Sequence, residues 1–221
     1  MALRLSRRAL LLGAALFLAR LPMAHADDDL VAAATRGDVA TIRRLIAAGA
    51  PVDARDASGR TALLAATHAD QVEAARVLIE AGADVNAKDD IEDSPFLYAA
   101  AEGRVEILKL TLAHGADLAS TNRYGGVALI PACHHGYPEA VRILLATAID
   151  VDHVNKLGWT ALLETVILSD GGPTHVDILK QLVAAGADLD LADRDGVTPL
   201  AHARKQGYAE MVAILEKAGA R

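Results

Sequence analysis

The stretch E-A-G-A-D-V-N-A, Glu80 to Ala87, decides the fold because its core returns at a fixed interval along the chain. The same core recurs in A-A-G-A, A-H-G-A-D-L, A-A-G-A-D-L-D and K-A-G-A, at residues 47–50, 113–118, 184–190 and 217–220. Its glycines stand at 49, 82, 115, 186 and 219, and Ala148 occupies the remaining position of the series. The steps are therefore 33, 33, 33, 38 and 33 residues, a regularity that indicates a repeat protein.

A second sequence marker keeps the same register. T-A-L-L, S-P-F-L, V-A-L-I, T-A-L-L and T-P-L-A begin at residues 61, 94, 127, 160 and 198. A 33-residue period in which T-P-L opens one helix and G-A-D closes the next is typical of ankyrin repeats. The chain therefore resembles the ankyrin-repeat family from about Asp27 to Arg221. This resemblance implies an all-α repeat solenoid of helix-turn-helix units joined by β-hairpins or loops, and a protein-binding role.

The unit at 56–88 shows why the repeat folds in this way. Turn residues at 56–59 precede Thr61, which can cap a short helix over about 62–69. A second helix over about 72–81 carries an apolar stripe, and Gly82 can end it in the left-handed conformation. One helix pair cannot bury such a stripe alone, so neighbouring units must stack into a solenoid.

The register divides the chain into about six units including two caps. We expect an N-terminal capping repeat at 27–55, ankyrin repeats at 56–88 and 89–121, a divergent repeat at 122–154, a repeat with a five-residue insertion at 155–192, and a C-terminal capping repeat at 193–221. The insertion, Asp170 to Thr174, contains Gly-Gly-Pro and is predicted to be a loop. It either is a tolerated surface loop or shapes a binding edge.

Residues 1–26 have the pattern of an export signal. An N-terminal basic segment precedes eleven apolar residues at 9–19, and Ala24-His25-Ala26 supplies a cleavage signal. Ser6-Arg7-Arg8 also fits the twin-arginine signal, with an ordinary secretory signal as the alternative. Both routes predict a periplasmic protein cleaved after Ala26. Eleven apolar residues cannot cross about 30 Å of hydrocarbon, so we expect no permanent membrane anchor.

Charge and cysteine content narrow the function classes. Removal of residues 1–26 takes away four arginines and no acidic residue, which leaves 18 basic and 29 acidic residues. This acidic balance argues against nucleic-acid binding, which needs a basic face. A single cysteine cannot form an internal disulfide. We expect a monomer that binds a protein partner.

Cys133, His134 and His135 form the cluster that most suggests a reaction or a metal site. In the ankyrin register Cys133 faces the core, and both histidines fall on variable, outward positions. A core thiol is a poor nucleophile, and adjacent helical residues diverge by about 100°, so His134 and His135 are poorly placed to share a metal. The sequence contains no G-x-S-x-G, H-E-x-x-H or C-x-x-C motif. We therefore predict no enzymatic activity, cofactor or metal.

Apolar and aromatic residues at the hairpin tips predict the binding surface, since tips that only meet water should be polar. The predicted partner-binding residues are Ile91, Arg123, Tyr124, His134, His135, Lys156, Leu157, Trp159, Ile167 and Leu168. Trp159 could instead pack on the next hairpin. The predicted function is a periplasmic scaffold, adaptor or inhibitor that binds a protein on its concave face. The alternatives are a metal- or haem-handling protein that uses His134 and His135, and a chaperone that protects a secreted enzyme.

Overall fold

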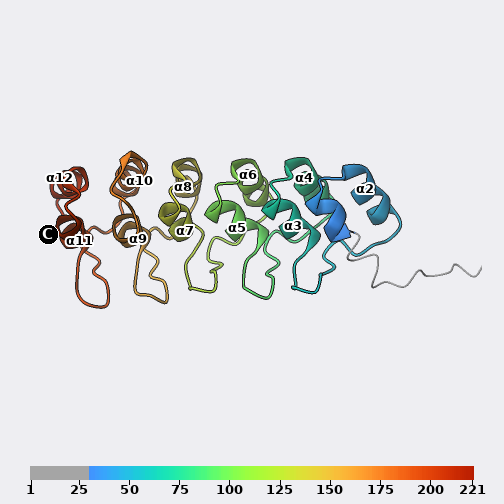
Figure 1. Ribbon diagram of the computed structural model, residues 1–221, viewed down its shortest axis with the longest axis horizontal. Coiled ribbons are helices and arrows are strands. Elements are labelled where there is room, and N and C mark those ends of the chain that lie inside the picture. Colours follow the sequence, from blue (N-terminus) through green and yellow to red (C-terminus); the bar gives the residue numbers. More distant parts are fainter. Residues whose placement is uncertain (1–29) are drawn as a thin grey trace, which may run out of the picture.

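The computed structural model describes residues 30–221, so the predicted export signal and its cleavage site lie outside the described residues. The described chain forms a row of helix pairs stacked along one axis (Figure 1). After a helix over 30–35, the outer row consists of α2 (Val39–Ala47), α4 (Val72–Glu80), α6 (Val105–Ala113), α8 (Pro138–Leu145), α10 (Pro173–Ala184) and α12 (Ala209–Ala218). The inner row consists of α3 (Ala62–His68), α5 (Pro95–Ala101), α7 (Leu129–His134), α9 (Ala161–Ile167) and α11 (Pro199–Gln206). The predicted all-helical repeat solenoid is confirmed.

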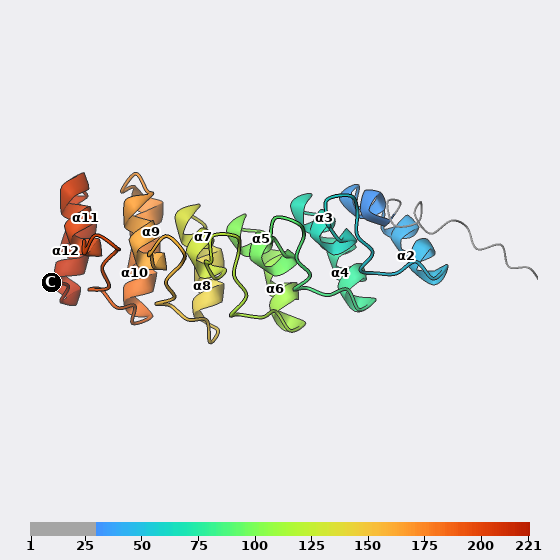
Figure 2. The ribbon, with the colours of Figure 1, turned by 90° about the horizontal axis from the view of Figure 1, so that it is seen from below.

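Loops of similar shape join each outer helix to the next inner helix and project to one side of the stack (Figure 1). We call these loops fingers; they cover residues 48–61, 81–94, 114–128, 146–160 and 185–198. Within residues 30–221 they contain no extended strand pair, and only isolated antiparallel bridges join Arg55 to Thr61 and Thr121 to Val127. Figure 2, seen from below, shows the repeats following one another in chain order from α2 to α12.

Local capping signals set where the inner helices begin. The hydroxyl of Thr61 accepts a hydrogen bond from the Leu64 N–H at 3.2 Å, as predicted, and Ser94, Thr160 and Thr198 make the equivalent bond. Repeat 4 has Val127 at this position, and its inner helix α7 starts only at Leu129, spans six residues and has no side-chain cap. The missing hydroxyl therefore shortens the helix that carries the two histidines.

An apolar layer between the inner and outer rows holds the repeats together. Phe96, Leu129 and Leu162 are among its large buried side chains, and Cys133 is fully buried there as predicted. The layer runs through all repeats as one cluster, because each pair packs on its neighbours. Over residues 30–221, none of the helices combines the length and the apolar character that crossing a bilayer requires.

The fingers share one hydrogen-bonded turn. At each turn an Asp or Asn Oδ1 accepts from the backbone N–H groups two and four residues later; these residues are Asp56, Asp89, Asn122, Asn155 and Asp193. Basic side chains then tie neighbouring fingers together, as where Lys88 Nζ donates to the Thr121 carbonyl at 2.6 Å. The fingers are thus a connected surface.

The predicted loop at 170–174 is wrong for its last two residues. Pro173 and Thr174 form the first turn of α10, which has 12 residues where the other outer helices have eight to ten. Proline suits this position because a first-turn N–H has no partner within the helix and its φ is already helical. Of the remaining residues, Gly171 lies against the Tyr208 ring of repeat 6, and the Tyr208 hydroxyl donates to the carbonyl of Ser169, just before the insertion, at 2.6 Å.

Candidate functional site

The candidate site is a groove of about 420 Å³ between the fingers and the inner helices of repeats 3, 4 and 5. Helices α5, α7 and α9 form one wall, and fingers 81–94, 114–128 and 146–160 form the other. Its lining includes charged groups from all three repeats and exposed apolar side chains from repeats 4 and 5. A groove that crosses three repeats has the shape expected for contact with another macromolecule.

Two small residues of repeat 4 leave the space for this groove. Gly126 stands at the finger position where the preceding repeat carries Asp93. Pro131 stands four residues after the capping position, where the neighbouring repeats carry Tyr98 and Glu164. All five residues line the groove, so the larger neighbours flank a recess in the divergent repeat.

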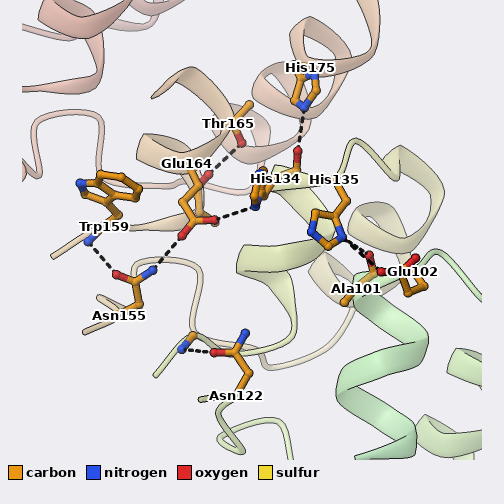
Figure 3. Close-up of polar contacts among 12 residues, drawn as sticks. Ala101, Glu102, Asn122, His134, His135, Asn155, Trp159, Glu164, Thr165 and His175 are labelled. Carbon is orange, nitrogen blue, oxygen red and sulfur yellow. Dashed lines mark hydrogen bonds and ion pairs between the residues drawn. The ribbon is translucent and has the colours of Figure 1, made fainter. Parts of the chain in front are cut away.

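Glu164, on α9, is a nearly buried acid at the groove, with 7% of its side chain exposed. Asn155 Nδ2, from finger 146–160, donates to Glu164 Oε1 at 2.8 Å, while Asn155 Oδ1 holds the finger turn (Figure 3). Glu164 Oε2 lies 3.8 Å from His134 Nδ1, beyond hydrogen-bond distance. Burial raises the pKa of Glu164 to about 7, and the Asn155 hydrogen bond opposes that rise.

The two histidines lie in different environments. Burial lowers the pKa of His134, and the nearby His135 and His175 lower it further. His135 Nδ1 lies 2.6 Å from the Ala101 carbonyl, which can only accept, so this nitrogen carries a proton and links α7 to α5 (Figure 3). Within residues 30–221, no three His, Cys, Asp or Glu side chains are grouped to hold a metal ion.

The neighbouring thiol is inert toward this surface. Cys133 is fully buried, and burial raises the pKa of its thiol far above the ordinary value. The three residues of the sequence cluster therefore separate, with Cys133 in the core and His134 and His135 at the groove.

The groove brings together six of the ten predicted partner-binding residues: Arg123, Tyr124, His134, His135, Leu157 and Leu168. The other four, which do not line it, are Ile91, Lys156, Trp159 and Ile167. Ile91 is exposed at a finger tip, but Lys156 Nζ donates to the Arg123 carbonyl at 3.0 Å and so joins two fingers. Trp159 is half-buried, and its backbone N–H donates to Asn155 Oδ1 (Figure 3).

The groove carries more negative than positive groups. Asp93, Glu102 and Glu164 contribute carboxyl groups, whereas Arg123 contributes the one guanidinium group among the lining residues. Arg123 lies 3.7 Å from Asp93 and 5.0 Å from the centre of the Tyr124 ring, so its charge is already shared within the groove. Burial is the main cause that raises the pKa of Asp93.

Glu164 and Asn155 are not among the residues predicted from the sequence. Two signals were available: Glu164 interrupts the apolar run A-L-L-E-T-V-I, and it follows Asn155 by nine residues. Repeat 6 has a polar pair at the same spacing, in which His202 Nε2 lies 2.7 Å from Asp193 Oδ2. In repeats 5 and 6, the residue that forms the finger turn therefore contacts the inner-helix residue nine positions later.

Comparisons with known proteins agree with this architecture. A family model for ankyrin repeats (3 copies) matches residues 24–89 and 96–193. The chain is similar to the crystal structure of an ankyrin repeat domain from Acinetobacter baumannii AYE, with 54% identity, a TM-score of 0.85, and 87% of this chain and 98% of that one covered. It is also similar to the human ASB11 ankyrin repeat domain, with 28% identity, a TM-score of 0.74, and 87% and 84% of the two chains covered.

A further similarity is local. Over 59 residues the chain is 42% identical to YahD of Escherichia coli (strain K12), which is named as an ankyrin repeat protein. That match covers 27% of this chain and 29% of YahD, so it extends over less than a third of the relative's length.

Proposed function

This chain belongs to the ankyrin-repeat family, and we propose that it is a periplasmic, non-catalytic scaffold, adaptor or inhibitor whose protein partner binds in the groove of repeats 3 to 5. Ankyrin repeat domains generally mediate protein–protein binding. One observation carries the proposal for this surface. Tyr124, Leu157 and Leu168 are 53%, 46% and 40% exposed and all line the same groove. Exposed aromatic and aliphatic side chains gathered at a concave surface favour a protein contact.

The experiment uses the chain beginning at Asp27 as bait for periplasmic extract, with bound proteins identified by mass spectrometry. Tyr124→Ala/Leu157→Ala should reduce capture of the partner at least about tenfold, since central aromatic and apolar contacts dominate such interfaces. Val154→Ala is the matched control, because Val154 is 52% exposed in the same finger region but does not line the groove.

The melting temperature of each variant separates contact from folding. We expect the double variant to melt close to the parent protein, because both side chains are largely exposed. A large drop in melting temperature would mean that these side chains stabilise the fold instead. Equal capture by the double variant would place the partner elsewhere.

The periplasmic location rests on the sequence pattern of residues 1–26. Arg7→Lys/Arg8→Lys should retain the full-length chain in the cytoplasmic fraction if export follows the twin-arginine route. Normal export of this variant would favour the general secretory route, and a cytoplasmic location of the parent protein would contradict the proposal.

A further inference from the structure

We propose that the groove binds a basic side chain of the partner, preferably an arginine. Its guanidinium group would lie at Glu164 Oε2, the carboxylate oxygen that Asn155 does not contact. This inference rests on the proposed function, and it names the chemistry that the partner must present. The partner would place a cation between α7 and α9 and lay the methylene groups of the same side chain along the apolar part of the groove.

Glu164 has an incomplete set of contacts. Only 7% of its side chain is exposed, and Asn155 Nδ2 donates only to Oε1. Among residues 30–221, Oε2 has no hydrogen-bond donor, and the nearby His134 Nδ1 is 3.8 Å away. A buried carboxylate is stable when it has a cation and hydrogen bonds, so this oxygen is placed to accept from an incoming donor.

The lining of the groove carries more negative than positive groups. Three carboxyl groups face one guanidinium group, that of Arg123, which already lies beside Asp93. His134 adds no reliable positive charge at neutral pH, because burial and the neighbouring histidines lower its pKa. The groove therefore attracts a cation and repels an acidic side chain.

The groove has a recess together with exposed aromatic and aliphatic side chains. Gly126 and Pro131 leave a recess in repeat 4, and the exposed side chains of Tyr124 and Leu157 line the same groove. A guanidinium group is planar, donates several hydrogen bonds and stacks on aromatic rings. Arg123 lies over the Tyr124 ring, 5.0 Å from its centre, so a guanidinium group already stacks in this way within the groove.

The test uses a small probe in place of the unidentified partner. N-acetyl-L-arginine amide is titrated into the chain beginning at Asp27 at about pH 8, where Glu164 is ionised, and binding is followed by amide chemical shifts. We expect saturable shifts in repeats 3 to 5 with a dissociation constant in the millimolar range, which is usual for one side chain. The neutral isostere N-acetyl-L-citrulline amide should bind at least about tenfold more weakly.

Variants then assign the binding to one carboxylate. Glu164→Gln should weaken binding of the arginine probe at least about tenfold. Glu106→Gln is the matched control, because Glu106 is an exposed glutamate of α6 that pairs with Lys109 at 2.8 Å and does not line the groove; it should leave the dissociation constant unchanged within about twofold. Circular dichroism checks that both variants remain folded.

Three outcomes would overturn the inference. They are the absence of saturable shifts up to about 50 mM probe, equal binding of the citrulline probe, and unchanged binding by the Glu164→Gln variant. Preferential binding of N-acetyl-L-glutamate amide would likewise reverse it, since it would show a groove for acidic partners.

The capture experiment separates this inference from the proposed function. If Tyr124→Ala/Leu157→Ala loses the partner and Glu164→Gln retains it, the protein-binding groove stands and the basic anchor is wrong. If the arginine probe binds through Glu164 and no groove-dependent protein is captured, the cation site stands and the proposed function fails.

Discussion

Glu164→Gln should stabilise the protein above neutral pH, although it removes a charged side chain from a hydrogen-bonded pair. Glutamine has nearly the same shape as glutamate, and its Oε1 can still accept from Asn155 Nδ2. The substitution removes only the negative charge that is held in a site with 7% exposure and no close cation. The wild-type protein must ionise Glu164 in this site at alkaline pH, whereas the variant never does.

The pKa of Glu164 gives the size and the pH window of this effect. The pKa rises from 4.5 to about 7 in the folded protein, so the folded state binds more protons than the unfolded state between these two values. Stability of the wild type should therefore fall as pH increases through this window and level off above it. The difference in pKa corresponds to at most about 3 kcal/mol. The variant should gain little at pH 4.5 and up to this amount at pH 8.

Other groups also make stability depend on pH, so the quantity to measure is the difference in unfolding free energy between wild type and variant. The lowered pKa of His68 and His134 makes stability increase with pH below about 6.5, and the raised pKa of Asp93 acts in the same direction as that of Glu164. Wild type and variant share these contributions, so they largely cancel in the difference in unfolding free energy. The exception is the interaction of His134 with Glu164, 3.8 Å away, which the variant changes.

Urea unfolding at several pH values measures this difference. Circular dichroism follows the whole stack and fluorescence follows Trp159, the single tryptophan, which lies in the same repeat as Glu164. Coincident transitions are required before a free energy is derived, because repeat arrays can unfold in parts. Glu106→Gln serves as the exposed control, because 61% of the Glu106 side chain is exposed. A difference that is constant with pH, or a variant less stable than wild type at pH 8, would refute the reasoning.

Three further outcomes follow from single contacts. Cys133 should react with a thiol reagent only after denaturation, because it is fully buried and its pKa is raised; rapid modification of the native protein, monitored by absorbance, would contradict its core position. Phe96→Ala should lower the free energy of unfolding by about 3–5 kcal/mol in urea titration, since Phe96 is fully buried; a loss below about 1 kcal/mol would show that the site collapses around the vacancy. Asn155→Asp should keep the finger turn but lose the donor to Glu164 and set two carboxyl groups together, so its stability should fall more steeply with pH than that of wild type; parallel curves would refute this contact.

Much of the candidate site could be predicted from repeat register. Register placed Cys133 inward and His134 and His135 at the groove, and it identified Tyr124, Leu157 and Leu168 as exposed. Register describes a typical repeat, however, and the groove depends on departures from it. Lys156 shows the limit, because its position is outward yet its ammonium group donates to the neighbouring finger.

The insertion shows a second limit. Gly-Gly-Pro ends regular structure in most contexts, but a proline after two glycines also suits the first turn of a helix. Here Pro173 begins α10, so two inserted residues lengthen the helix instead of the loop. The choice depends on the space available beside the next repeat, where Tyr208 packs against the shortened loop.

The sequence by itself determined the period, the order of the helix pairs, the caps at Thr61 and its equivalents, and the inward position of Cys133. These features are local, because a solenoid is built from contacts within one repeat and with its immediate neighbours. Only the tertiary structure decided that Gly126 and Pro131 open a groove, that Asn155 holds Glu164 beside His134, and that Trp159 stays outside. Those facts depend on side-chain volumes and distances between different repeats, which a one-dimensional register does not contain.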